Sequence, residues 1–393
     1  MNGGPLSFGL VGAGAIAQAY AQAFRRLAAG RVAGVADVRP AAARALAEEL
    51  GCAAFASHEE MAERLDLDAV LVCTPPATHA EICLHWLGRG RSVLCEKPLA
   101  LDAAVARRLH AAAEEAGAVL TMASKFRYVE DVRRAKSIVA SGILGEIVLF
   151  ENAFTARVDM AKRWNAQPRV SGGGVLIDNG THSVDLVRYF LGPVAEVNAV
   201  EGKNVQGLPV EDTVRLFMRS HDGVMASIDL SWSLNKELPS YLDIYGSHGT
   251  VRVGWKESRY RQAGSSDWVV FGSGYDKVEA LRAQLDNFCA AVAGREPLLI
   301  QAEDAIASVE VIEAAYASLR DSHWRPVEHG EGAAAVAAAA GVAPAAHAAH
   351  VATTADVAGV AHAADIAAVP GGGAAGLEAS VSADLAAGAR LPA

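Results

Sequence analysis

Asp178 and His182 have the types and spacing for acid/base chemistry. They are four positions apart in a predicted helix over 173–191, so their side chains share one helical face. A carboxylate placed there can orient the imidazole and adjust its pKa, which suits proton transfer to and from a substrate. A capped helix with a polar stripe is the alternative explanation. For Asp185, three positions after His182, a structural role is the better prediction.

Lys97 is a second candidate, within Cys95-Glu96-Lys97-Pro98. This motif follows the apolar run 92–95, and ligands of open parallel sheets bind beyond the carboxyl ends of the strands. Pro98 restricts the backbone of Lys97 to extended geometry, which fixes where the ammonium leaves the chain. Apolar strand ends can lower the pKa of a lysine and so suit it to proton transfer. An ordinary surface lysine at a strand end is the alternative.

The run Gly12-Ala13-Gly14-Ala15-Ile16-Ala17 follows a predicted strand over 8–11 and opens a helix. In that context, this G-x-G-x-x-A pattern predicts a dinucleotide site. Gly12 permits the tight turn, Gly14 lets the backbone approach a pyrophosphate, and Ala17 allows the helix to pack closely on the strand. The free N–H groups at the start of the helix, at Ala15 and Ile16, would face the phosphates.

Asp37 ends the second apolar run, where an acidic residue is expected to bind a ribose 2′-hydroxyl. This favours NAD over NADP. Arg39, two positions later, could instead pair with a 2′-phosphate, so NADP stays open. Thr74-Pro75-Pro76 and His79 follow the run 69–73 and are expected to shape the pocket around the nicotinamide half of the cofactor. An ordinary proline-rich turn is an equal alternative there.

The elements that must position these residues fall into three segments. Residues 1–123 alternate apolar runs (7–11, 32–36, 69–73, 92–95 and 118–122) with helical patterns, which predicts an α/β doubly wound parallel sheet. Residues 124–330 carry helices near 129–141, 173–191, 276–293 and 302–319, with strands near 147–153, 194–201, 212–219, 223–232, 241–245 and 250–253. That pattern predicts an α+β domain on an antiparallel sheet. The tail, 331–393, holds 28 alanines and no aromatic residue, and is predicted to be disordered.

Composition excludes several classes of protein. The net charge is −10 and the sequence has no basic stripe, which argues against nucleic-acid binding. The five cysteines form no C-x-x-C pair, so neither a metal site nor a disulfide framework is predicted. The alanine-rich stretch near 333–349 lacks the large apolar residues of a membrane helix, and the N-terminus has no leader-like run. We therefore expect a cytoplasmic protein without a membrane anchor.

With these motifs, the chain resembles the glucose–fructose oxidoreductase/inositol dehydrogenase (Gfo/Idh/MocA) family over about residues 5–328. The resemblance rests on the glycine motif, Thr74-Pro75, Glu96-Lys97-Pro98, the segment Gly172–Asp185 and a closing helix from Glu303 to Tyr316. It implies a Rossmann domain followed by a domain with a large open antiparallel sheet, which commonly supports homodimers or homotetramers. The substrate would lie between the nicotinamide and the Gly172–Asp185 helix.

The resemblance also implies roles for single residues. Lys97 would bind and polarise the reacting oxygen, His182 would be the acid/base, and Asp178 would bind a substrate hydroxyl or position His182. Lys125, Arg127 and Trp164 are weaker candidates for the substrate pocket. The cofactor set is then Gly12, Gly14, Ala15, Ile16, Asp37, Arg39, Thr74, Pro75, His79, Glu96 and Lys97.

The activity implied is that of an NAD(P)-dependent dehydrogenase. It would move a hydride between nicotinamide and a hydroxyl-bearing carbon of a sugar, a nucleotide sugar or an inositol-like cyclitol. The alternatives within the family are an NAD-dependent glycosidase that oxidises its substrate transiently and a regulator that binds the cofactor without turnover. The presence of Lys97, Asp178 and His182 argues against the regulator.

Overall fold

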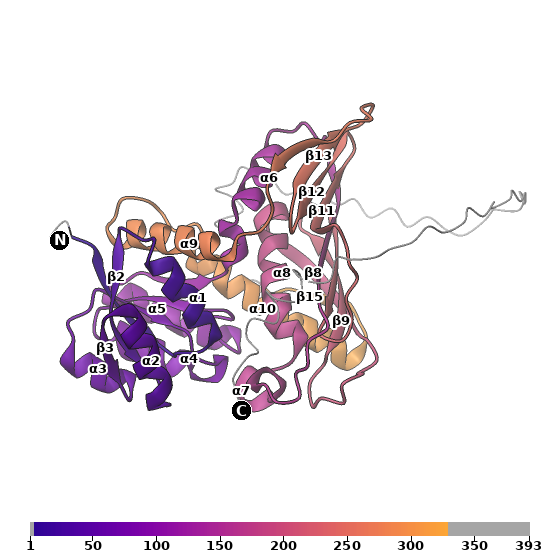
Figure 1. Cartoon of the computed structure of the whole chain (residues 1–393). Coiled ribbons are helices and arrows are strands. Elements are labelled where there is room, and N and C mark those ends of the chain that lie inside the picture. Colours follow the sequence, from indigo (N-terminus) through magenta and orange to yellow (C-terminus); the bar gives the residue numbers. More distant parts are fainter. Residues whose placement is uncertain (1–3, 329–393) are drawn as a thin grey trace, which may run out of the picture.

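The computed structural model of the chain describes residues 4–328. Two sheets stand side by side with helices between them and around the first sheet (Figure 1). The predicted tail, 331–393, lies outside the described residues. No described helix is both long enough and apolar enough to cross a membrane.

The first sheet is parallel and six-stranded, in the order β3-β2-β1-β4-β5-β6. Its central strands β4 and β5 are buried along their whole length and mainly apolar, as is typical of a doubly wound sheet. The strands are β1 (Leu6–Val11), β2 (Gly30–Ala36), β3 (Ala53–Phe55), β4 (Ala69–Val72), β5 (Ser92–Glu96) and β6 (Leu120–Ala123). The predicted parallel sheet is confirmed, and the three-residue β3 is the one strand that the apolar runs did not indicate.

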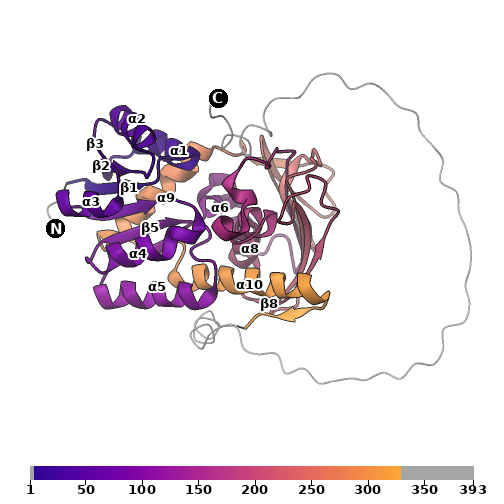
Figure 2. The same cartoon turned by 90° about the horizontal axis from the view of Figure 1, so that it is seen from below.

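Helices cover both faces of this sheet, and two of them come from the far end of the chain. One face packs against α1 (Ala15–Phe24), α2 (Pro40–Leu50) and α9 (Lys277–Val292). The other packs against α3 (His58–Arg64), α4 (His79–Leu87), α5 (Ala103–Ala116) and α10 (Ala302–Asp321). Leu281, Leu285 and Phe288 of α9 are fully buried in the first of these cores. The segment predicted as a second domain therefore sends its last helices back to the parallel sheet (Figure 2).

The second sheet has nine strands in the order β14-β13-β12-β11-β7-β10-β9-β8-β15. Neighbouring strands are antiparallel except β7 and β10, which pair in parallel, so the sheet is mixed rather than purely antiparallel. Its strands are β7 (Ile147–Thr155), β8 (Val194–Glu201), β9 (Thr213–Ser220), β10 (Met225–Ser231), β11 (Ser240–Gly246), β12 (Gly249–Gly254), β13 (Ser258–Gln262), β14 (Val269–Gly272) and β15 (Arg325–Pro326). The last three were missed because they are short and lack a regular apolar alternation.

One face of the second sheet packs against helices, mainly α6 (Glu130–Ala140), α8 (Val175–Leu191) and α10. Figure 2 shows α6 and α8 lying between the two sheets and α10 running from beside α5 to the second sheet. Helix α10 contacts α5 beside the first sheet as well as α8 and β8 beside the second, so it joins the two layers. Helix α8 is thereby held in the space between the carboxyl edge of the parallel sheet and the second sheet.

Candidate active site

The glycine motif forms a tight turn between β1 and α1. Gly12 has a positive φ of 95°, and a Cβ added to it would lie 2.7 Å from the carbonyl oxygen of Cys73. Gly14 is the N-cap of α1, with no side chain capping the helix, and a Cβ added there meets nothing within 4 Å. The first turn of α1, at Ala15 and Ile16, therefore opens onto free space, which fits the approach of a pyrophosphate.

The Asp37 carboxylate fixes this turn to the end of β2. Its Oδ2 accepts a hydrogen bond from the backbone N–H of Ala13 at 2.7 Å. Arg39 donates to the same carboxylate from its backbone N–H at 2.8 Å and from its guanidinium at 3.2 Å. Partial burial acts to raise the pKa of Asp37, but these hydrogen bonds outweigh it and lower the pKa. Asp37 is thus a charged acceptor at the place where a ribose is expected, and Arg39 lies against it.

The turn after β4 is organised from inside the protein by His79. This ring is fully buried, with Nε2 2.8 Å from the carbonyl oxygen of Thr74 and Nδ1 2.9 Å from that of Pro98. Burial lowers the pKa of His79, against the opposing effect of the two carbonyls. His79 therefore ties the Thr74-Pro75 turn to the Lys97-Pro98 turn, and any effect it has on a cofactor passes through those two turns.

Lys97 reaches from the end of β5 to helix α8. Its Nζ lies 2.5 Å from Asp178 Oδ1 and donates to the Asp178 carbonyl oxygen at 2.8 Å. The peptide bond between Lys97 and Pro98 is cis. The ammonium predicted at the tip of a parallel strand and the carboxylate predicted on a helix more than 80 positions away therefore meet directly.

His182 lies one turn after Asp178 on α8 and is almost fully buried, with 7% of its surface exposed. The ring packs edge-on against Phe126, with centroids 5.0 Å apart. Among the described residues, Nδ1 has no hydrogen-bond partner, and no hydrogen bond joins the ring to Asp178. Burial lowers the pKa of His182 well below its ordinary value of 6.5, and the nearby charges of Lys97 and Lys125 add to the effect. The imidazole is therefore neutral and able to accept a proton.

Two models of known protein families match this chain, and the matched residues include the glycine turn, Lys97 and the Asp178–His182 pair. The family model described as "oxidoreductase family, NAD-binding Rossmann fold" matches residues 6–124. The model of the GFO/IDH/MocA C-terminal domain matches residues 132–252. The chain belongs to the GFO/IDH/MocA family. The match confirms the family resemblance inferred from the motifs. It also confirms the prediction that the cofactor is a nicotinamide dinucleotide.

Individual relatives support the same placement. Inositol 2-dehydrogenase of Rhizobium meliloti is 27% identical over 80% of this chain and 97% of its own length. The 1,5-anhydro-D-fructose reductase of Ensifer adhaerens is 30% identical over 62% of this chain and 74% of its own. Among solved structures, GenD2 from gentamicin A biosynthesis, in complex with NAD, is 27% identical with a TM-score of 0.74. The match covers 83% of this chain and 97% of that one.

The three weaker candidates for the substrate pocket lie in different surroundings. Lys125 begins η2 (Lys125–Tyr128), and its charge acts on both His182 and Glu96. Trp164 begins η3 (Trp164–Ala166) and is 41% exposed. Arg127 is only 3% exposed and forms ion pairs with Asp185 at 2.7 Å and Asp304 at 2.9 Å. Its charge is therefore used inside the protein, which argues against the predicted contact with substrate.

Sequence reasoning missed Asn165, Glu211 and Tyr316. Asn165 Nδ2 lies 3.4 Å from Asp178 Oδ2, so η3, just before α7 (Pro168–Ser171), reaches the acidic group of the site. Glu211 Oε1 accepts hydrogen bonds from the N–H groups of Gly174 and Leu176 and from the Tyr316 hydroxyl, at 2.8–3.1 Å. The signal was the triple glycine, since three glycines in a row indicate close approach by another part of the chain.

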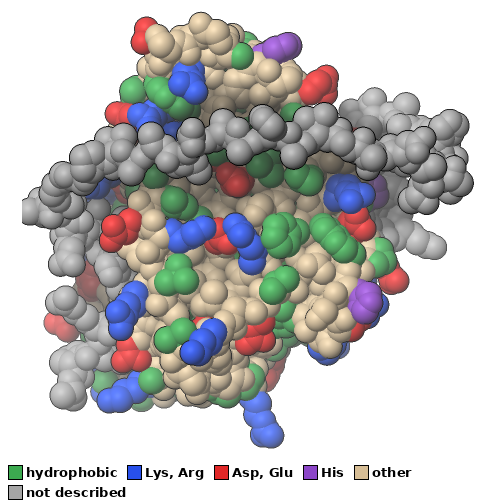
Figure 3. Space-filling model, turned by 90° about the vertical axis from the view of Figure 1, so that its right-hand side faces the viewer, with side chains coloured by type: hydrophobic (Ala, Val, Ile, Leu, Met, Phe, Trp, Pro, Cys, Tyr) green, Lys and Arg blue, Asp and Glu red, His purple; other side chains and the backbone are tan. Residues whose placement is uncertain are grey.

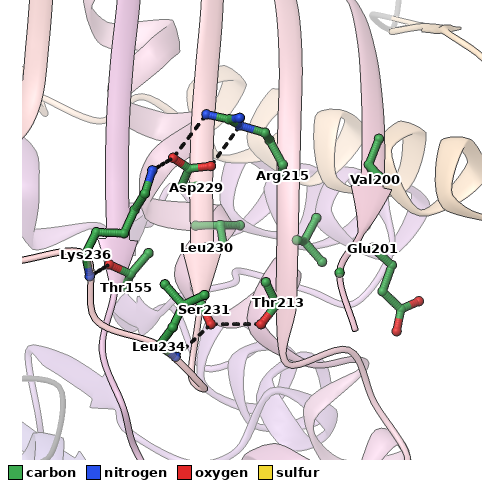
Figure 4. A pocket seen from close by; sticks show the side chains of 12 residues that line it. Thr155, Val200, Glu201, Thr213, Arg215, Asp229, Leu230, Ser231, Leu234 and Lys236 are labelled. Carbon is green, nitrogen blue, oxygen red and sulfur yellow. Dashed lines mark hydrogen bonds and ion pairs between the residues drawn. The ribbon is translucent and has the colours of Figure 1, made fainter. Parts of the chain in front are cut away.

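A hollow on the second sheet lies apart from these residues. Figure 4 shows its lining, in which Asp229 faces Arg215 and Lys236. Arg215 lies 2.8 Å from Asp229, and Lys236 also pairs with it, so both cations of this hollow share one carboxylate. None of the predicted site residues lines this hollow.

Proposed function

We propose that this chain is an NAD-dependent dehydrogenase acting on a hydroxyl-bearing carbon of a sugar, a nucleotide sugar or an inositol-like cyclitol. The observation that carries the proposal is the contact between Lys97 and Asp178 with a neutral His182 one helical turn away. The names of the relatives above, an inositol dehydrogenase and an anhydrofructose reductase, support this substrate class.

The nicotinamide, when bound, supplies the hydride acceptor. Gly12 and Gly14 would hold the pyrophosphate against the start of α1, and Asp37 would accept hydrogen bonds from the adenine ribose. Thr74, Pro75 and Glu96 lie at the strand ends nearest to Lys97, on the side expected for the nicotinamide.

His182 is the proposed base in this reaction. Its neutral ring would take the proton of the substrate hydroxyl as the hydride leaves the same carbon. The Lys97 ammonium would stabilise the negative charge that develops on the substrate oxygen, and Asp178 holds that ammonium in place. In the opposite direction, the same groups would protonate a carbonyl oxygen.

The test is a screen of inositols, aldoses and nucleotide sugars, with NAD and NADP, that follows the absorbance of the reduced cofactor. Turnover with a polyol that is lost in Lys97→Met and kept in the exposed-surface variant Lys256→Met supports the proposal. Cleavage of an aryl glycoside without net NADH formation would instead identify a glycosidase. Tight NAD binding without turnover on any compound would identify a regulator.

We also propose that the chain works in the cytoplasm as a homodimer or homotetramer joined through the second sheet. On the open face of the second sheet, Val200 of β8, Phe217 of β9 and Met225 of β10 are exposed. Figure 3 shows apolar side chains among charged ones on this side of the molecule. Apolar side chains gathered on one sheet face are typical of a subunit interface. Light scattering should show more than one chain per particle, and Phe217→Glu with Met225→Glu should yield monomers. All five cysteines are free, which suits a reducing compartment.

A further inference from the structure

Glu96, directly before Lys97, is the centre of a buried polar group drawn from three elements. Tyr20 of α1 is fully buried, and Gln284 of α9 is 1% exposed. The Tyr20 hydroxyl lies 3.1 Å from Glu96 Oε1 and 3.0 Å from Gln284 Oε1. The other carboxyl oxygen of Glu96 accepts the backbone N–H of Lys97 at 3.2 Å. Helices α1 and α9 thereby reach the residue that positions the backbone of Lys97.

This buried group has fewer hydrogen-bond donors than the acceptor oxygens that face them. A tyrosine hydroxyl has one hydrogen to donate, yet it faces two oxygens, one from Glu96 and one from Gln284. Gln284 Nε2 is buried and has no hydrogen-bond partner in this orientation. Because the oxygen and nitrogen of an amide are interchangeable by a half-turn, two arrangements satisfy the Tyr20 hydroxyl as both donor and acceptor.

The two arrangements differ in the charge on Glu96. With Glu96 ionised, the turned Gln284 amide donates to Tyr20, and Tyr20 donates to the carboxylate. With Glu96 protonated, the carboxyl donates to Tyr20, and Tyr20 donates to the Gln284 oxygen. No side chain leaves its place in either case. The hydrogen bond to an ionised carboxylate is the stronger one, so Tyr20 favours the charged form.

The charges that surround Glu96 belong to the active site. Lys97 and Lys125 act on Glu96, and the same two cations act on His182. Burial raises the pKa of Glu96 against the opposing effect of these lysines and of Tyr20. The other titratable neighbours are Tyr20, Cys73 and Cys95, and burial raises the pKa of each, so all three stay protonated and neutral.

We propose that Tyr20 and Gln284 are positioning residues that set the charge of Glu96 and, through it, the charge balance around Lys97 and His182. The effect on catalysis rests on the proposed dehydrogenase function. With Glu96 ionised, a negative charge acts on Lys97 and Lys125, the two cations that act on His182. With Glu96 protonated, that negative charge is absent.

The experiment uses the full chain without substrate, so it does not depend on turnover. Infrared spectroscopy over the pH range in which the protein stays folded would follow the C=O stretch of protonated carboxyl groups, and the band lost in Glu96→Gln identifies Glu96. Tyr20→Phe removes the hydroxyl and should move the midpoint of that band to higher pH by about one unit, since a hydrogen bond to a charged group is lost. Gln284→Met removes one bond from each arrangement, so its shift should be smaller.

Tyr128→Phe is the matched control. Tyr128 is also buried and donates to an α9 amide, Asn287 Oδ1, at 3.0 Å, one turn after Gln284. The Tyr128→Phe variant should leave the midpoint of the Glu96 band unchanged. An inflection in the pH profile of kcat/KM should move in Tyr20→Phe, and the shift should vanish in a Glu96→Gln background. Equal midpoints in Tyr20→Phe and Tyr128→Phe, or the absence of a titrating band that Glu96→Gln removes, would overturn the proposal. Failure to find a polyol substrate would leave the infrared result standing.

Discussion

The dinucleotide edge of the site and the α8 face that meets Lys97 are held by different kinds of contact. At the dinucleotide edge, the backbone itself makes the site: Gly12 fills a position where a Cβ would lie 2.7 Å from a carbonyl oxygen, and Gly14 leaves open space. On the α8 face, charged side chains make the site. Asp178 is held by Lys97 and Asn165, which come from other parts of the chain. The dinucleotide edge is therefore determined by residues close together in the sequence. The α8 face is determined by contacts between distant parts of the chain.

His182→Ala tests the α8 face with the largest expected effect. Removing the base should lower kcat by about 10³-fold, because positioned acid/base groups contribute about 10²–10⁴-fold. The dissociation constant of NADH should stay nearly unchanged, since the glycine turn is untouched. Steady-state kinetics and fluorescence titration of NADH would measure the two effects. His323→Ala, at an exposed histidine, is the control. A nearly normal kcat in His182→Ala would show that His182 is not the base.

Local encoding explains what could be predicted from the sequence. Gly12, Gly14 and Asp37 lie within one strand–helix–strand unit, and Lys97 directly follows a strand, so spacing alone placed them. The Asp178–His182 spacing fixed a shared helix face but not a partner: the carboxylate pairs with Lys97 because an ammonium attracts it more strongly than a neutral ring. Arg127 was expected in the pocket, yet it lies in the buried ion pairs with Asp185 and Asp304. No spacing rule reveals such long-range pairs.

The pH dependence sharpens the account of His182. Burial and two lysines lower its pKa well below 6.5, so the ring stays neutral, and able to accept a proton, down to acidic pH. Oxidation of the alcohol should therefore lose rate on the acid side, by about tenfold per pH unit below that pKa. Lys125→Met removes one of the cations and should move this acid limb of kcat/KM to higher pH. An unmoved limb would show that another group controls it.

Two glycine variants test whether the dinucleotide edge is built from the backbone. Gly12→Ala should destabilise the cofactor-free protein by about 2 kcal/mol, because a positive φ and a close carbonyl oxygen both oppose a side chain. Gly14→Thr should leave that stability nearly unchanged, since threonine is as good an N-cap as glycine and its side chain enters open space. Both should weaken NAD binding, by about tenfold or more. Denaturant unfolding and calorimetric titration separate the two effects, and equal unfolding midpoints for both variants would contradict this picture.

Glu211 and Tyr316 test how tertiary contacts hold α8. A Cβ on Gly173 would lie 1.9 Å from the Tyr316 hydroxyl, and one on Gly174 would lie 2.0 Å from the Glu211 carbonyl oxygen, so the glycines exist to admit these two residues. Glu211→Ala leaves two backbone N–H groups and a hydroxyl without an acceptor and should lower the free energy of unfolding by about 3 kcal/mol. Tyr316→Phe removes one of these bonds and should cost about 1 kcal/mol.

The kinetic signature of these two variants distinguishes a mispositioned helix from a damaged cofactor site. A small displacement of α8 moves Asp178 and His182 together, so kcat should fall by about tenfold in Glu211→Ala and less in Tyr316→Phe. NADH binding should stay unchanged in both, because neither residue contacts the glycine turn. If NADH affinity fell as far as kcat, α8 and the dinucleotide edge would behave as one cooperative unit. The difference between the two regions would then be structural only and would not separate cofactor binding from catalysis.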